Sequence, residues 1–192
     1  MGLRLGAREI ALSALLAGLY AGLVVALGPI SFLVLQVRVA DALLPLALLF
    51  GKPAIVGLAL GCFVANFFGL PFPFSLADAV LGSLANFLAC SLGYKLGRGA
   101  KNAKRAFLTT LAMTGVITAV VGTYLPFLLV ACGIPPDLPF LSAEVAPPPL
   151  GLLVVGWVGV GLGSLVAVNV LGFPLLVAVR RAIPRAFLPI ED

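Results

Sequence analysis

Long runs of apolar residues, broken by Gly, Pro and charged residues, dominate the pattern along this chain. A helix that crosses a bilayer needs about 20 consecutive apolar residues. The runs therefore predict an all-α integral membrane protein with six transmembrane helices. The predicted spans cover residues 9–27, 39–50, 53–68, 76–96, 106–131 and 150–179, within a single transmembrane domain over residues 1–192.

Three of the predicted spans have special features. The first apolar run extends to Leu27, longer than the ~7–15 residues of a signal-peptide core, so we expect it to be an uncleaved span. Residues 39–50 are too few to cross a bilayer alone without tilt or a re-entrant neighbour. Gly172 and Pro174 predict a kink near the end of the sixth span.

Composition favours lipid over water as the surroundings of this chain. Of its residues 62% are hydrophobic and only 10% are charged, whereas a soluble domain carries roughly 25% charged residues. Histidine is absent, which removes the commonest general base and metal ligand. Cys62, Cys90 and Cys132 form no CxxC pair and are expected to be small buried apolar side chains. No metal site and no cofactor are predicted.

The charged residues sort by side if both termini are cytoplasmic. Every Lys and Arg except Arg38 then falls in the N-terminus, the turn at Lys52, the loop between the fourth and fifth spans, or the C-terminal tail. Asp41, Asp78, Asp137 and Glu144 fall on the outer side. This is the positive-inside pattern of a multi-pass protein of the cell membrane. The net charge of +5 therefore indicates orientation and lipid headgroup contact, and nucleic-acid binding is not expected.

Several function classes lack their motifs. No GxxxxGK[ST] phosphate-binding loop is present, so this chain is not expected to hydrolyse ATP by that route. No acidic pair lies at mid-membrane, as ion-driven carriers often have. A transporter of this kind would need an outside energy source. The alternatives are an intramembrane enzyme, which without histidine would need Asp-Asp or Ser-Lys chemistry, and a purely structural subunit.

Polar residues on the outer side are candidates for a ligand site. Arg38 and Asp41 are three residues apart and can pair on a helix, either as an interfacial ion pair or over a ligand. Asp78 fits a capping box with Ser75 but would also lie at the outer mouth. Asn86 lies near mid-membrane, where its amide needs a partner, in a neighbouring helix or in a ligand.

A second group lies in the outer half under the same topology. Tyr124 and Trp157 are either interfacial anchors or rings that stack on a flat ligand. Asn66 and the carboxylate of Glu144 add polar groups, and a carboxylate can accept two parallel N–H bonds from a guanine-like edge. Thr118 continues a ladder of hydroxyls that either bond to their own helix or line a pocket. The residues alone indicate an outward-facing site for a small polar ligand.

Small residues on the first span define a possible contact face. Ala14, Gly18 and Gly22 are four residues apart, as are Ala17 and Ala21, and this spacing aligns them on one helix face. Such a face allows another helix backbone to approach closely. The approaching helix belongs either to this chain or to a partner subunit.

Four segments resemble the QueT family: LGPISFLVLQVRVADALLP, GKPAIVGLALGCFVANFFGL, LADAVLGSLANFLA and VLGFPLLVAVRRA. These proteins are substrate-binding S components of energy-coupling factor (ECF) transporters, linked to uptake of queuosine precursors. The resemblance implies six helices with a pocket near the outer face, and a 7-deazaguanine ligand such as preQ0 or preQ1. It also implies partners, namely a transmembrane coupling subunit that meets the small-residue face of the first span, and two ATPase subunits.

The chain departs from the family pattern at four positions. Asp41 stands where relatives usually have Glu, and Ser164 where an acid is expected. Thr118 and Tyr124 stand near expected positions of an Asn and an acid. All four residues are candidate contacts to the substrate. Changed polar groups alter which ligand a site accepts, so the departures leave open an S component for a different vitamin or nucleobase.

Overall fold

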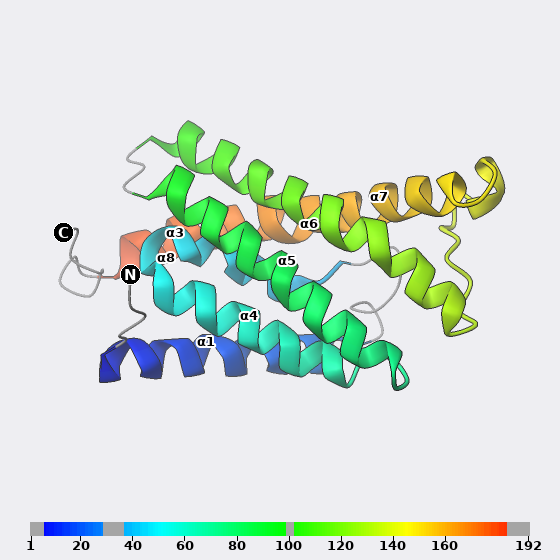
Figure 1. Ribbon diagram of the computed structural model, residues 1–192. Coiled ribbons are helices and arrows are strands. Elements are labelled where there is room, and N and C mark those ends of the chain that lie inside the picture. Colours follow the sequence, from blue (N-terminus) through cyan, green and yellow to red (C-terminus); the bar gives the residue numbers. More distant parts are fainter. Residues whose placement is uncertain (1–5, 29–36, 99–101, 184–192) are drawn as a thin grey trace.

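The computed structural model describes residues 6–28, 37–98 and 102–183. Its helices run alternately along the long axis of an elongated bundle (Figure 1). In chain order they are α1 (Ala7–Ala26), the 3-10 helix η1 (Val39–Leu46), α3 (Ala47–Phe50), α4 (Lys52–Phe67), α5 (Phe74–Gly97), α6 (Ala103–Ala131), the 3-10 turn η2 (Ala143–Val145), α7 (Leu150–Ser164), the π-helix η3 (Leu165–Gly172) and α8 (Phe173–Ala182). The all-helical prediction is confirmed for the part of the chain described.

The six predicted spans are only partly reproduced. Four helical stretches among the described residues are long and apolar enough to cross a membrane: α1, α5, α6, and the continuous helix Leu150–Ala182 formed by α7, η3 and α8. The stretches Val39–Phe50 and Lys52–Phe67 are shorter. Gly51 separates these two with a φ of 60°, a left-handed conformation that costs glycine little. The count of six full spans is thus not established.

The short stretch η1–α3 lies inside the bundle. Ten of its twelve residues are buried, and Val39 and Leu49 are half-buried. It contacts α1, α4, α5, η3 and α8. An element that is covered on all sides needs no polar face, which explains why its sequence is almost entirely apolar. Its interior position brings the residues that begin it, Arg38 and Asp41, to the centre of the molecule.

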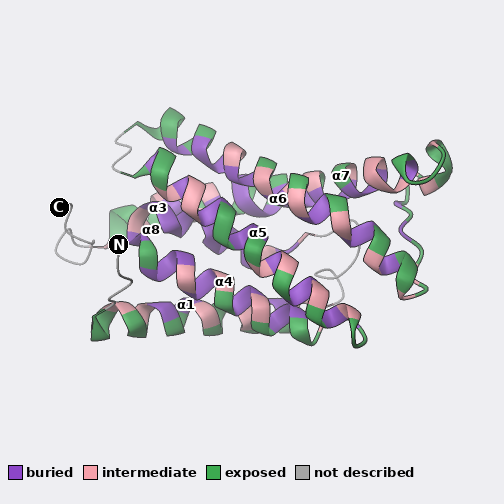
Figure 2. Ribbon diagram, viewed as in Figure 1, coloured by how far each residue is buried: buried purple, intermediate pink, exposed green. Residues whose placement is uncertain are grey.

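The outward faces of the helices are apolar. Leu15, Val25 and Phe68 are exposed by 66%, 65% and 76%, and Figure 2 shows exposed residues along the outer sides of α1, α4 and α5. Soluble proteins rarely expose large contiguous apolar surface. An apolar exterior around a packed interior is the arrangement expected of a protein whose surroundings are lipid.

Two glycines of α4 set the crossing with α1. A Cβ atom at Gly57 would lie 2.4 Å from the backbone oxygen of Ser13, and one at Gly61 would lie 2.6 Å from that of Ala17. The four-residue spacing places both glycines on one face of α4. Small residues at this spacing let two membrane helices approach closely. This contact fixes the α1 face that points inward: Ser13, Leu16, Tyr20 and Val24 are its buried residues.

The last long helix widens before the predicted kink. The π-helix η3 ends at Gly172, directly ahead of Pro174 in α8. Within η3 the side chain of Asn169 accepts a hydrogen bond from Thr114 (2.6 Å) and donates one to Thr110 (2.9 Å). These bonds tie η3 to α6. A Cβ atom at Gly172 would lie 2.9 Å from the backbone oxygen of Ala42, so η3 also supports η1.

All described basic residues except Arg38 lie at one end of the bundle, as the sequence predicted. The start of α1, the α3–α4 junction, the end of α5, the start of α6 and the end of α8 all lie at one end of the bundle (Figure 1). We call this the basic end; its described basic residues are Arg8, Lys52, Lys95, Arg98, Lys104, Arg105, Arg180 and Arg181. Asp137 and Glu144 lie in the connection between α6 and α7, at the opposite end.

Candidate functional site

Polar side chains from five elements meet inside the apolar bundle. We call Tyr20, Arg38, Asp41, Cys62, Asn66, Asp78 and Tyr124 the polar cluster. Arg38, Asp41 and Asp78 expose only 4%, 5% and 1% of their surface. Buried ionisable groups in a membrane protein are costly and usually functional. Each member comes from the part of its helix, or its approach to a helix, that is remote from the basic end.

Each carboxylate of the polar cluster accepts a hydrogen bond from a tyrosine of another helix. The Tyr20 hydroxyl in α1 donates to Asp41 Oδ1 at 2.6 Å. The Tyr124 hydroxyl in α6 donates to Asp78 Oδ1 in α5 at 2.7 Å. Hydroxyl bonds of this length to a carboxylate are short, charge-assisted bonds. They hold both carboxylates in place.

Arg38 is the cation of the polar cluster. Its guanidinium interacts electrostatically with both Asp41 and Asp78. Its Nη1 also donates to Cys62 Sγ of α4 at 3.7 Å. Arg38 therefore lies near Asp41, as the sequence predicted, and also near a second carboxylate, Asp78 of α5. Two carboxylates and one guanidinium give the polar cluster a formal charge of minus one.

Two buried asparagines, Asn66 in α4 and Asn86 in α5, add amide groups to the helices of the polar cluster. Asn66, which is fully buried, donates from Nδ2 to the backbone oxygen of Asp78 at 3.2 Å. Its Oδ1 and the Nδ2 of Asn86 have no hydrogen-bond partner among the described residues. Asp78, Gly82 and Asn86 are four residues apart and share one face of α5. A buried amide group without a partner is costly, so these two atoms offer one acceptor and one donor to a ligand.

Gly82 leaves space at the centre of this face. A Cβ atom there would lie 2.4 Å from Asn66 Nδ2, 3.3 Å from the Tyr124 hydroxyl and 3.5 Å from Cys62 Sγ. Even alanine would therefore push into the polar cluster. The glycine lets α5 approach α4 and α6 closely enough for Asp78 to reach Tyr124.

The structure assembles part of the predicted site. Arg38, Asp41, Asn66, Asp78 and Tyr124 come together, and Asn86 lies on the adjoining face of α5. The capping-box prediction for Ser75 and Asp78 is wrong. The N-cap of α5 is Pro73 and makes no side-chain bond. Because the helix begins earlier than predicted, Ser75 lies within its first turn and the Asp78 carboxylate bonds Tyr124.

Four other candidates have different surroundings. Glu144 is exposed in η2, and Trp157 is 46% exposed with its indole N–H donating to Thr123 at 3.0 Å. Thr118 packs towards Gly161 of α7, and Ser164 is buried at the end of α7. None of these four contacts the polar cluster through an interaction found among the described residues, and their role as substrate contacts stays a prediction.

Tyr20 and Gly82 were not among the residues predicted from the sequence, and Cys62 was expected to be a buried apolar side chain. Tyr20 is the single tyrosine of α1 and falls in register with buried Leu16 and Val24, a signal visible in the sequence. Cys62 is buried as expected, but its sulfur accepts a bond from Arg38.

The small-residue face of α1 points away from the bundle. Gly18 and Gly22 have open space where a Cβ would project, Ala14 is exposed and Ala21 is half-buried. Within the chain, α1 instead uses Ser13, Ala17 and Tyr20 against α4. Of the two possibilities left open by the sequence, packing inside the chain holds for Ala17, whereas Ala14, Gly18 and Gly22 are exposed among the described residues.

Comparison with known proteins agrees with these features. A family model described as QueT transporter matches residues 10–181. No curated protein and no solved structure matches the chain. The matched residues include the whole polar cluster, and a transporter family is consistent with the prediction of a membrane transport protein that is not an enzyme. Since the match covers most of the chain, this protein belongs to the QueT transporter family.

Proposed function

We propose that this chain is the substrate-binding S component of an ECF transporter and that it binds a 7-deazaguanine, preQ0 or preQ1, for ATP-driven uptake of queuosine precursors. The observation that carries the proposal is the pair of buried carboxylates, Asp41 and Asp78, each held by a tyrosine and both interacting with Arg38. The family match supports transport as the activity. The polar cluster supports a polar, nitrogen-rich ligand.

The groups of the polar cluster complement a guanine-like edge. A carboxylate can accept two parallel N–H bonds, as the ring N–H and the exocyclic amine of a guanine present them. A guanidinium can donate to the ring carbonyl oxygen. Asn66 Oδ1 and Asn86 Nδ2 supply a further acceptor and a further donor. Because the tyrosines already fix both carboxylates, less conformational freedom is lost when the ligand binds.

The charge of the site favours one of the two ligands. The polar cluster carries two carboxylates and one guanidinium, so a ligand with one positive charge would balance it. The aminomethyl group of preQ1 is cationic near neutral pH, whereas the nitrile of preQ0 is neutral. A hydrogen bond to a charged group contributes about 1.5–3 kcal/mol, so we expect preQ1 to bind about tenfold more tightly than preQ0, or better.

The energy for transport would come from partner subunits. We infer that the basic end faces the cytoplasm, so the polar cluster lies towards the outside, where the substrate arrives. The small-residue face of α1 would meet the coupling subunit, which carries two ATPase subunits. Reorientation of the loaded chain in the membrane would then deliver the substrate inward.

Binding to purified protein tests the proposal. We expect Asp78→Asn and Asp41→Asn to raise the Kd for preQ1 about 30-fold or more, because truncating a buried charged partner costs about 2 kcal/mol or more. Asp137→Asn is the matched control, since Asp137 is exposed in the α6–α7 connection. Titration calorimetry with preQ1, preQ0 and guanine measures the effect.

Mass spectrometry of small molecules that purify with the protein separates the alternatives. Recovery of a non-purine ligand, with no affinity for 7-deazaguanines, would identify an S component for a different vitamin or base. Unchanged preQ1 affinity in both aspartate variants would reject the polar cluster as the binding site.

A further inference from the structure

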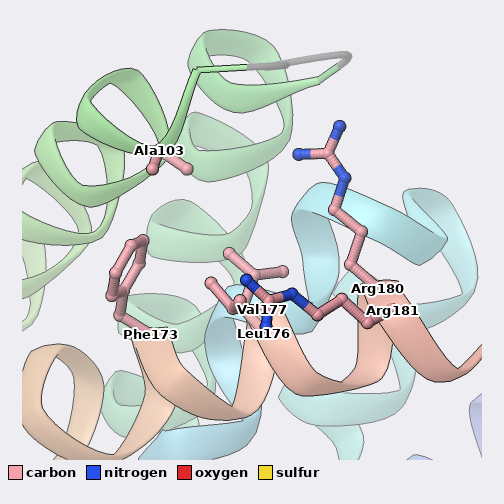
Figure 3. Close-up of a pocket in the computed structure, with 7 residues that line it drawn as sticks. Ala103, Phe173, Leu176, Val177, Arg180 and Arg181 are labelled. Atoms are coloured by element: carbon pink, nitrogen blue, oxygen red, sulfur yellow. The ribbon is translucent and has the colours of Figure 1, made fainter.

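A cavity lies at the basic end of the bundle, between α6 and α8. Its volume is about 320 Å³, and it is lined by Ala103, Ala106, Phe173, Leu176, Val177, Arg180 and Arg181. Figure 3 shows the side chains of α8 directed towards the start of α6. The volume falls at the lower end of the ~300–1,000 Å³ that small-molecule sites occupy.

The lining of this cavity changes from apolar to basic along α8. Phe173, Leu176 and Val177 are followed at helical spacing by Arg180 and Arg181, so all five share one helix face. Phe173 is held edge-to-face against Phe107 of α6, with ring centroids 5.3 Å apart. The apolar part lies towards the middle of the bundle, and the two guanidinium groups lie in the last turn of α8.

This cavity is distinct from the polar cluster. Ala106 lines the cavity and Tyr124 belongs to the polar cluster, and eighteen residues of α6 separate them. At 1.5 Å per residue this separation is roughly 27 Å along the helix. No member of the polar cluster lines the cavity. A ligand here would therefore act at the other end of the molecule from the proposed substrate.

We propose that this cavity binds one anionic phospholipid. Its phosphate lies at Arg180 and Arg181, and its glycerol backbone and first acyl methylenes lie on Phe173, Leu176 and Val177. The end of a membrane-crossing helix lies at headgroup depth, and a lipid presents the same order of charge and apolar chain along this axis. A guanidinium binds phosphate oxygens bidentately. A free phosphate would leave the apolar wall unused.

Native mass spectrometry of the full chain tests the proposal. The protein is transferred to detergent micelles that contain equal amounts of phosphatidylglycerol and phosphatidylethanolamine with identical acyl chains. We expect one phosphatidylglycerol to be retained in preference to phosphatidylethanolamine. Each basic residue near a membrane surface favours anionic lipid by about fivefold, so Arg180→Gln and Arg181→Gln should each lower the retained ratio of the two lipids by about that factor.

Two further variants locate the lipid. Lys52→Gln removes an exposed charge at the same end but outside the cavity and should leave the lipid ratio unchanged. Val177→Trp fills the cavity, keeps both arginines and should abolish retention. Because both lipids are read in one spectrum, partial unfolding lowers both signals together. Equal retention of the two lipids, an equal loss in Lys52→Gln, or undiminished retention in Val177→Trp would each overturn the proposal.

Discussion

Gly82 gives the polar cluster the space it occupies, because any side chain there would collide with Asn66 and approach Tyr124. We predict that Gly82→Ala displaces the Asn66 amide from the backbone oxygen of Asp78 and weakens the Tyr124–Asp78 bond. Overpacking of a buried site costs about 1–3 kcal/mol, enough to exceed the gain of up to about 1 kcal/mol from better helix propensity. Thermal unfolding in detergent should show a lower Tm, and preQ1 affinity should fall.

Gly115→Ala is the matched control for this substitution. Gly115 also lies in a transmembrane helix, but it is exposed and has open space where a Cβ would project. Alanine there should leave stability unchanged or raise it slightly, with unaltered ligand affinity. If Gly82→Ala behaves like Gly115→Ala in both measurements, the close packing around Asn66 is not what shapes the site.

The candidate site was predictable where a polar side chain occupies an apolar span. Arg38, Asp41, Asn66 and Asp78 stand out for this reason, since lipid makes an unsupported charge or amide costly. Trp157 and Thr118 lie in the half of the bundle that holds the polar cluster, but the Trp157 indole bonds Thr123 and the Thr118 side chain packs towards Gly161. Depth follows from position along a helix, whereas direction follows from packing against neighbours, which a single sequence does not supply. The role of Gly82 could not be predicted from the sequence, because the glycine acts by leaving space for the side chains around it.

The outward face of α1 carries a prediction about assembly. Gly18 is exposed and has open space where a Cβ would project, so Gly18→Leu should leave the fold and ligand affinity intact. The same leucine should obstruct close approach of a coupling-subunit helix, because membrane helices meet through small residues. We expect a severalfold lower yield of the complete ECF complex, measured by co-purification with tagged coupling subunit.

Gly115→Leu provides the comparison for assembly. It adds the same side chain to an equally open position on α6, and the complex yield should match that of the unaltered chain. A normal yield for Gly18→Leu would remove α1 from the coupling interface. Equal losses for the two leucine variants would indicate a general defect in membrane insertion.

The positions of the helices along the chain were the part of the fold that the sequence predicted best. The predicted fourth and fifth spans, 76–96 and 106–131, differ from α5 and α6 by three residues or fewer at either end. Apolar length does not distinguish an α-helix from a 3-10 or π-helix, however, since an apolar run is compatible with all three. The 3-10 helix η1 and the π-helix η3 pack against each other. Both therefore depend on contacts between distant segments.

Among the described residues, four helical stretches are long and apolar enough to cross a membrane, and the stretches Val39–Phe50 and Lys52–Phe67 are shorter. Charge at the ends, rather than span length, therefore decides the topology. Lys52 lies at the α3–α4 junction, on the same end as Arg8 and Lys104 (Figure 1). Placing these residues on different sides of a bilayer would leave basic side chains in lipid, which is costly.

Cysteine labelling in intact cells tests this orientation. In a Cys132→Ser parent the other two cysteines, Cys62 and Cys90, are buried and should not react with a membrane-impermeant maleimide. We predict that Glu144→Cys is labelled in intact cells, whereas Arg8→Cys and Lys104→Cys react only after permeabilisation. Labelling of Arg8→Cys and Lys104→Cys from opposite sides would show that the number of crossings is odd between them. That result would contradict the outward-facing polar cluster on which the proposed capture of substrate depends.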